Sequence, residues 1–177
     1  MAARRRVPSL EAAKAAFLSE WGALGPSWGV SRTMSQIHAL LMIEPEPLTT
    51  DEVMEALQIS RGSAHTNIKE LCEWGLLRRA KQPGERKDHY EAEKDVWKVV
   101  QAIVRARKRK EVEPVLDTLD RCLSDTKGLR GVEAAAFRSQ LTELQRFARM
   151  GDRVMEKVER GASSRILSWV TRFLGRS

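Results

Sequence analysis

Apolar residues recur at helical spacing along most of the 177-residue chain. Near the N-terminus this spacing predicts a helix over residues 9–21, which stops in the stretch 22–26 because that stretch contains glycines and a proline. Ser31 then has the position and chemistry of an N-cap, and it predicts a second helix that closes before the prolines of 44–47.

The most complete boundary signals belong to a pair of helices in the middle of the chain. Thr49 is placed as an N-cap with Glu52 as its capping-box partner, and Leu48 and Val53 form the apolar contact that often accompanies such a start. A tight connection leads into a second helix over residues 60–74, which begins at a serine and ends before a glycine.

Two short strands are predicted after this helix pair, at residues 76–79 and 88–93, joined by a loop at 81–87. Two short capped helices followed by a two-stranded ribbon with a basic tip describe a winged helix-turn-helix. We therefore expect a DNA-binding domain of this kind over residues 31–95.

The helical period returns after the wing, in a long segment where Pro114 either kinks one helix or starts another. A later helix over 133–159 carries an apolar seam, whose residues are spaced alternately four and three positions apart. This spacing is typical of a helix that packs against another helix. The seam consists of Phe137, Leu141, Leu144, Ala148, Gly151, Met155 and Val158. A short amphipathic segment follows at 164–174. We expect residues 1–30 and 96–177 to serve dimerisation. The predicted fold class is mainly α with a small β-wing, a winged helix-turn-helix head plus a long helical dimerisation region.

The charge balance points to a class of partner. The chain has 31 Lys and Arg against 24 Asp and Glu, a formal net charge of +7. A basic protein gains affinity for a polyanion because neutralised phosphates release their counterions. Charge alone does not name the polyanion, so the prediction depends on where the basic residues lie.

The outward side of the 60–74 helix is small and polar. Such a face can enter the major groove without steric conflict and present donors to base edges. The alternative is a merely solvated helix, but that would more usually carry pairs of Glu and Lys. The candidate DNA-binding residues of this helix are Arg61, Ser63, His65, Thr66, Asn67 and Lys69.

The strand–loop–strand segment is rich in cations, with Glu85 as the acid set against them and a Pro-Gly pair shaping its tip. Contact with phosphates or the minor groove follows from this composition, although a solubilising hairpin is the alternative. The candidate DNA-binding residues of the wing are Arg79, Lys81, Arg86 and Lys87.

Motifs for catalysis or metal binding are missing from the sequence. His38, His65 and His89 lie far apart, and no nucleophile elbow, zinc-protease motif or phosphate loop occurs. Cys72 and Cys122 stand among apolar neighbours and are expected to be reduced, buried thiols. We expect no enzyme activity, no metal and no cofactor. With no membrane span and no secretion signal in the pattern, the expected location is cytoplasmic.

Four stretches together resemble the GbsR-like branch of the MarR-type transcriptional regulators. They are FLSEWGALGPSWG at 17–29, LTTDEVMEALQISRGSAHTNIKEL at 48–71, WGLLRR at 74–79 and GERKDHYEAEKDVW at 84–97. The resemblance spans residues 10–123. It implies a homodimer held by N- and C-terminal helices, with each recognition helix in a major groove of double-stranded DNA and each wing beside it.

Some members of this branch respond to choline-like compounds, which the resemblance makes a possible effector class. A cage of aromatic rings suits a quaternary ammonium, and Trp21, Trp28 and Trp97 are its conceivable walls. The alternative is that these tryptophans are packing anchors at helix ends, which is the commoner use of such residues.

The sequence thus predicts a sequence-specific DNA-binding transcriptional regulator, a repressor, acting as a homodimer on a pseudo-palindromic operator. The main alternative is a winged-helix protein–protein interaction module without specific DNA binding, since fold does not fix function. A third reading is peripheral membrane binding by the 164–174 segment, whose shortness favours packing instead.

Overall fold

A computed structural model describes residues 9–81 and 84–160 of the chain. The chain divides into two compact units, residues 1–99 and residues 100–177. The structure is mainly helical with one small antiparallel sheet, so the predicted fold class is confirmed. The amphipathic segment predicted at 164–174 lies outside the described residues.

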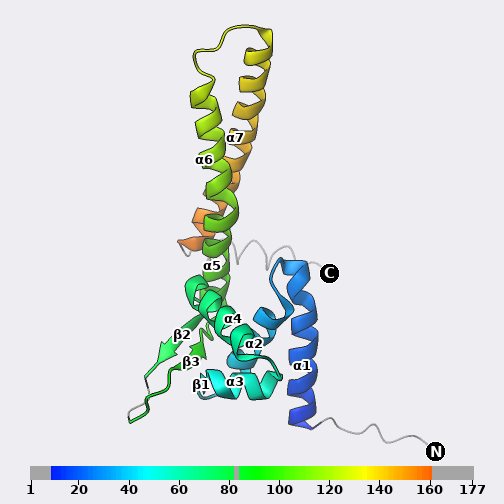
Figure 1. Ribbon diagram of the computed structural model, residues 1–177. Helices are drawn as coiled ribbons and strands as arrows, with labels where there is room; N and C mark the ends of the chain where they lie inside the picture. The colour runs from blue at the N-terminus through cyan, green and yellow to red at the C-terminus, as the bar shows by residue number, and fades with distance from the viewer. Residues whose placement is uncertain (1–8, 82–83, 161–177) are drawn as a thin grey trace, which may run out of the picture. The chain divides into compact units, whose positions relative to one another are not determined.

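The first unit contains four α-helices and a three-stranded sheet among its described residues, and α5 begins at its end (Figure 1). Its helices are α1 (Leu10–Leu24), the 3-10 turn η1 (Gly25–Trp28), α2 (Arg32–Ile43), α3 (Thr50–Leu57) and α4 (Arg61–Trp74). Its strands are β1 (Leu48–Thr49), β2 (Leu77–Ala80) and β3 (His89–Ala92). The helix α5 spans Val96–Arg107.

The helix α2 lies at the centre of this unit, in contact with α1, α3, α4 and β3. Its residues Ile37 and Leu41 are among the most deeply buried side chains, together with Val53 of α3 and Leu71 of α4. These residues occupy the apolar faces predicted from the helical spacing. The burial of one contiguous apolar cluster is what holds the helix pair α3–α4 in place.

The first helix ends inside the predicted stop, but it runs past Gly22 to Leu24. Gly22 is buried, and a Cβ atom at this position would lie 2.4 Å from Cγ of Gln36 in α2. The glycine therefore permits a close approach of two helices here, rather than ending the first of them.

The sheet has three strands in the order β1–β3–β2, whereas the sequence predicted a two-stranded ribbon. The extra strand, β1, pairs antiparallel with β3 through Leu48 opposite Tyr90 and Thr49 opposite His89. A strand of two residues is too short to show the alternation of apolar and polar side chains that identifies a strand. The same two residues were also assigned to the start of α3. The two predicted wing strands are confirmed as β2 and β3, and β1 was missed for this reason.

The predicted capping box at the start of α3 is confirmed. The backbone N–H of Glu52 donates to Oγ1 of Thr49 over 3.2 Å, and the backbone N–H of Thr49 donates to Oε2 of Glu52 over 2.7 Å. These bonds with Thr49 hold the pKa of the Glu52 carboxyl below its usual range. Two backbone donors that the helix cannot satisfy internally are thereby paired.

Replacing Thr49 with alanine should lower the free energy of unfolding by about 1 kcal/mol, because the N-cap of α3 is lost and part of a buried side chain of β1 is removed. Urea denaturation followed by circular dichroism measures the change. Thr50→Ala is the matched control, since its side chain makes no hydrogen bond within the described part of the chain. Equal losses in the two variants would contradict the capping role.

The second unit is a hairpin of long helices. After α5 the chain passes through a π-helical turn, η2 (Lys108–Val112), and then forms α6 (Glu113–Asp125) and α7 (Val132–Glu159). Pro114 stands in the first turn of α6, where a missing N–H costs nothing. The structure therefore resolves the alternative left open at Pro114: a π-helical turn precedes it and a new helix starts there.

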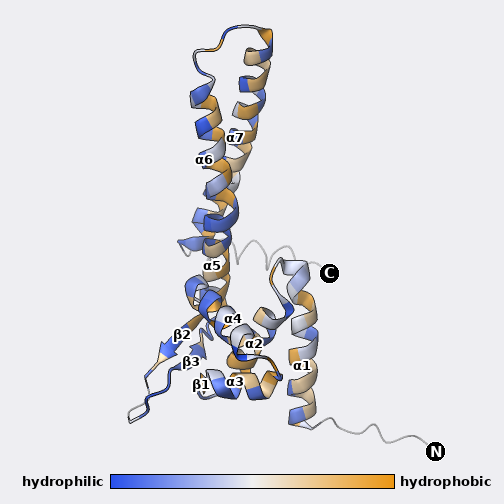
Figure 2. Cartoon of the chain, viewed as in Figure 1, coloured by the Kyte–Doolittle hydropathy of each residue, from blue (hydrophilic) through white to orange (hydrophobic). Residues whose placement is uncertain are grey.

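The apolar seam of α7 is divided between two surfaces. Leu141, Ala148 and Met155 are half-buried on α7, which packs on α6 and η2, whereas Phe137 and Leu144 are each 47% exposed. Other exposed apolar residues of α7 are Phe147, Met150 and Val154. Figure 2 shows apolar positions along α7 interleaved with polar ones. Part of the predicted seam is thus covered by the same chain, and part remains open.

Candidate nucleic-acid interface

A serine cap and a left-handed glycine define the two ends of helix α4, and apolar packing buries one of its faces. At its start, Oγ of Ser60 accepts a hydrogen bond from the backbone N–H of Ser63 over 3.3 Å. At its end, Gly75 adopts a left-handed conformation with φ of 76°, which closes the last turn. The buried face consists of Ala64, Ile68, Leu71 and Trp74. The opposite face therefore points away from the core.

The six predicted residues of α4 do not share one environment. Arg61, His65, Thr66 and Lys69 are exposed, whereas Ser63 and Asn67 are half-buried. The exposed residues, with Gly62 among them, make the surface small and polar near the start of the helix. This surface has the size and the donors that a major groove accepts.

Both the nitrogen and the oxygen of the Asn67 side-chain amide form hydrogen bonds within the chain. Its Nδ2 donates to the backbone carbonyl of Ser63 over 2.8 Å, and its Oδ1 accepts from the hydroxyl of Ser31 over 2.9 Å. Ser31 is also the N-cap of α2, where it accepts from the backbone N–H of Met34. Asn67 therefore ties α4 to the start of α2, a contact that the sequence reasoning did not anticipate.

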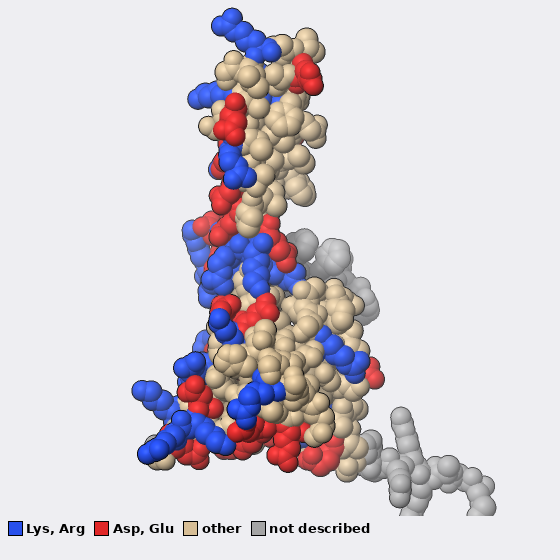
Figure 3. Space-filling model, in the orientation of Figure 1, with Lys and Arg blue, Asp and Glu red and all other residues tan. Residues whose placement is uncertain are grey.

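The wing strands β2 and β3 pair antiparallel from Leu77 opposite Ala92 to Ala80 opposite His89. At the far end of this ladder, Lys and Arg side chains gather beside acidic ones (Figure 3). Arg78 Nε lies 3.1 Å from Glu91 Oε1, and Arg79 Nη1 lies 3.6 Å from Asp88 Oδ2. The expectation of Glu85 as the single opposing acid was therefore too simple, because strand pairing brings Glu91 of β3, and Asp88 just before β3, close to cations of β2.

A further acid, Asp51 of α3, faces both α4 and the wing. Its Oδ1 lies 2.8 Å from Nη2 of Arg61, and its Oδ2 lies 2.9 Å from Nζ of Lys87. The hydrogen bond and charge of Lys87, with the charge of Arg61, hold the pKa of Asp51 below its usual range. Sequence reasoning missed Asp51 because Arg61 and Lys87 are distant from each other in the chain.

Two wing cations, Lys81 and Arg86, are exposed and make no ion pair with any described residue. Both belong to the loop that joins β2 and β3, on either side of residues 82–83. An unpaired surface cation is the group most ready to meet a phosphate, since no existing bond must be broken.

A buried histidine of β3, His89, fixes the end of the wing sheet that is next to the loop. His89 is 4% exposed. Its Nε2 lies 3.1 Å from Oε2 of Glu85, and its Nδ1 lies 3.1 Å from the carbonyl oxygen of Lys87. The imidazole thus spans the turn that leads from the loop into β3, and it holds that turn near the sheet.

Two of the three predicted cage tryptophans are in contact. The rings of Trp21 and Trp28 lie 5.0 Å apart at 68°, an edge-to-face arrangement, and Phe17 lies 5.4 Å from Trp21. Trp97, in the first turn of α5, is 48% exposed and joins no ring pair among the described aromatics. Edge-to-face pairs of this kind stabilise packing without a ligand.

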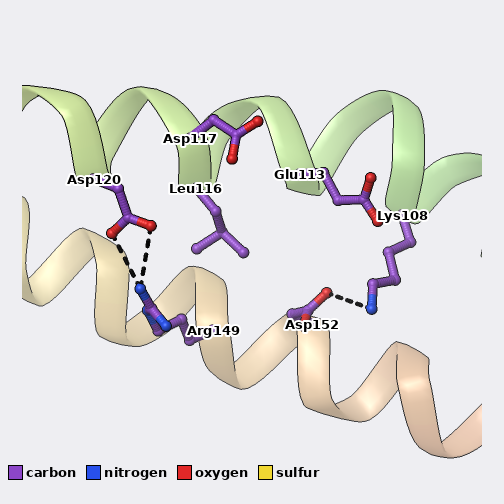
Figure 4. A pocket seen from close by; sticks show the side chains of 7 residues that line it. All are labelled: Lys108, Glu113, Leu116, Asp117, Asp120, Arg149 and Asp152. Atoms are coloured by element: carbon purple, nitrogen blue, oxygen red, sulfur yellow. Dashed lines mark hydrogen bonds and ion pairs between the residues drawn. The ribbon is translucent and has the colours of Figure 1, made fainter.

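The helical hairpin has a pocket of about 280 Å³ lined by charged residues of η2, α6 and α7 (Figure 4). Lys108 Nζ lies 3.0 Å from Asp152 Oδ1, and Arg149 Nη2 lies 3.1 Å from Asp120 Oδ1. The hydrogen bond to Asp152 raises the pKa of Lys108. Both cations of the pocket are therefore matched by acids across the hairpin, which fixes the register of α6 on α7.

The described residues offer neither a metal site nor a membrane-spanning helix. No group of three or more His, Cys, Asp or Glu side chains there is placed to hold a metal ion. Within the same residues, no helix has both the length and the apolar character that crossing a membrane requires. Cys72 and Cys122 are free thiols and half-buried rather than fully buried.

Comparison with known proteins places this geometry in context. Residues 28–88 match the model of the MarR family. Over 98 residues the chain is 26% identical to the HTH-type transcriptional repressor GbsR of Bacillus subtilis (strain 168), which covers 55% of this chain and 54% of that protein. The chain spans about half the length of this curated relative. A crystal structure described as a transcriptional regulator shares the fold, with a TM-score of 0.68 and 18% identity over 86% of this chain and 99% of that one.

Proposed function

We propose that this chain, a GbsR-like winged-helix protein of the MarR type, is a sequence-specific DNA-binding transcriptional regulator. By analogy with its curated relative, the direction of control is repression. Such a protein acts where the chromosome is accessible, which in a bacterial setting is the cytoplasm.

The observation that carries the proposal is the pairing of an exposed polar helix face with unpaired wing cations on one compact unit. Thr66 and His65 of α4 are exposed and suited to base edges. Lys81 and Arg86 of the wing are suited to phosphates. Arg61 and Lys69 flank the helix face, where their charge favours the backbone over the bases.

The regulator is proposed to act as a homodimer on a pseudo-palindromic operator. The open part of the α7 face supports this assembly, because Phe147, Met150 and Val154 are 70%, 51% and 58% exposed. An exposed apolar stripe of that length is costly in water and typical of a surface that meets another helix. Two reading helices related by a two-fold axis would then contact half-sites about one helical turn apart.

Selection of bound duplexes from a genomic fragment library, followed by gel shift, tests the proposed function. We expect a recovered site with two-fold symmetry and a shifted band whose stoichiometry is two chains per duplex. A folded protein that binds all fragments alike, or none at low salt, would overturn it. Binding to a protein in place of DNA would instead identify an interaction module.

Arg86→Ala should weaken binding to every duplex and reduce the slope of log affinity against log salt by about 0.9, because one phosphate contact is lost. The matched comparison is Arg79→Ala, whose guanidinium already has Asp88 as a partner 3.6 Å away. That variant should change the salt slope less. Fluorescence anisotropy over a salt series measures both slopes, and a larger effect from Arg79→Ala would contradict the assignment.

A further inference from the structure

We infer that Asp51 belongs to the DNA interface, where its carboxylate holds Arg61 and Lys87 in the place that a phosphate would occupy and so restrains the sequence-independent part of DNA binding. The inference rests on the proposed function. It adds an acidic residue to an interface so far described by its cations.

The geometry resembles that of a bound anion. Each oxygen of Asp51 takes one cation, with Arg61 at 2.8 Å and Lys87 at 2.9 Å. The three side chains come from α3, from the start of α4 and from the end of the wing loop, so they converge from three separate segments. Two cations arranged around two oxygens in this way form a site that a phosphate can occupy equally well.

The other ion pairs of the reading helix and wing differ from this one. Lys69 pairs with Glu73 four residues along the same helix, and Arg78 and Arg79 pair with acids in or next to β3 of the same hairpin. Among the ion pairs found in the described residues of this interface, Asp51 is the acid that pairs with two cations from two different segments, α4 and the wing loop. It is therefore placed to act on the helix and on the wing together.

The cluster remains open to an incoming duplex. The side chains of Asp51, Arg61 and Lys87 are 43%, 74% and 66% exposed. Ion pairs this exposed contribute little to stability, because water and salt screen them. Their exchange for phosphate contacts is therefore feasible, and the fixed negative charge of Asp51 opposes it.

The opposition acts on every sequence alike. The repulsion between Asp51 and a phosphate concerns the DNA backbone, which every duplex presents. A random duplex and an operator therefore lose affinity by about the same factor, and base contacts to α4 still separate the two. Asp51 thus sets the overall affinity for DNA and leaves the choice of sequence to α4.

The experiment compares Asp51→Asn with Glu55→Gln in the full chain. Glu55 is an exposed acid of the same helix that pairs with neither cation, so its replacement makes the same change in net charge. Binding to a mixed-sequence duplex of about 30 base pairs, long enough for two half-sites, is followed by anisotropy between about 50 and 200 mM salt. Thermal melting of each variant checks the fold.

We expect Asp51→Asn to bind the mixed-sequence duplex roughly three- to tenfold more tightly at the lowest salt, with a salt slope steeper by about one to two phosphate equivalents. Glu55→Gln should change both quantities much less. Asp51→Glu, which keeps the charge, should bind like the unaltered protein. For the duplex recovered by genomic selection the gain should be of similar size, so that the ratio of the two affinities stays nearly constant.

Unchanged or weaker binding by Asp51→Asn in a folded protein would overturn the inference, as would an equal gain in Glu55→Gln. Asp51→Ser provides a second neutral variant if the asparagine variant does not fold. If the unaltered protein shows no preference for any duplex, the proposed function itself fails. If a preference is present and the affinity for mixed-sequence DNA is insensitive to Asp51, only the inference fails.

Discussion

The free energy of unfolding should fall by about 3 kcal/mol between pH 6.5 and pH 4 through the protonation of one buried histidine. His38 lies in α2 with 9% of its surface exposed, and its Nε2 has no hydrogen-bond partner within the described residues. Burial lowers its pKa from 6.5 to about 4. A charged imidazole in this position would be desolvated without compensation.

The direction follows from where the proton binds. In the unfolded chain the ring of His38 is exposed to water and takes up a proton near pH 6.5, whereas in the folded chain it stays neutral down to about pH 4. The unfolded state therefore holds more protons between these two values, so stability falls as the pH falls. Above pH 6.5 both states carry the neutral ring and the full stability is present.

Urea denaturation at a series of pH values measures this loss. His38→Leu removes the titrating group and keeps the site apolar, so most of the fall between pH 6.5 and pH 4 should disappear. The control is His65→Gln, which alters an exposed histidine of α4 and should retain the fall. A fall of undiminished size in His38→Leu would assign the acid sensitivity to other groups.

Thr66→Ala should change which operator sequence is preferred, with a loss of roughly 1 to 3 kcal/mol of discrimination at one base pair of each half-site. Thr66 is exposed on the outward face of α4, and neither its hydroxyl nor its methyl group is used in the core. Binding to mixed-sequence DNA and its salt dependence should stay nearly constant. Selection from a randomised operator library gives the preference, and anisotropy gives the affinity.

The comparison with Asn67→Ala separates reading from positioning. The Asn67 amide already binds Ser31 and the Ser63 carbonyl, so its removal should lower stability by about 1 kcal/mol. Its effect on base preference should be smaller than that of Thr66→Ala. Lys69→Ala serves as the control for charge, since it should weaken all duplexes alike. A larger shift in preference from Asn67→Ala would show that its amide leaves Ser31 to read a base.

The element boundaries around the reading helix could be predicted from the sequence because their causes are local. Thr49 and Glu52 satisfy each other across three residues, and Ser60 and Gly75 close α4 through contacts within one turn. A cap or a left-handed glycine acts on its immediate neighbours. For the same reason the placement of polar residues on the outer side of α4 was visible from the helical period.

Contacts between residues distant in the chain could not be read in this way. The strand β1 exists because Thr49 pairs with His89, and the side-chain oxygen of Asn67 is engaged because Ser31 donates a hydrogen bond to it. Asp51 acquires its two cations only when α3, α4 and the wing come together. No spacing rule in the sequence relates these positions.

The sequence by itself determined a pair of capped helices, a basic wing and a polar reading face, since each follows from propensity and periodicity over a few residues. Only the tertiary structure decided which of these polar groups are available to a partner. Folding leaves Thr66 and Arg86 exposed, and it engages Asn67 and Lys87 within the chain. The physical reason is that hydrogen bonds and ion pairs select partners by distance in space, and that distance is set by the packing of the core around α2.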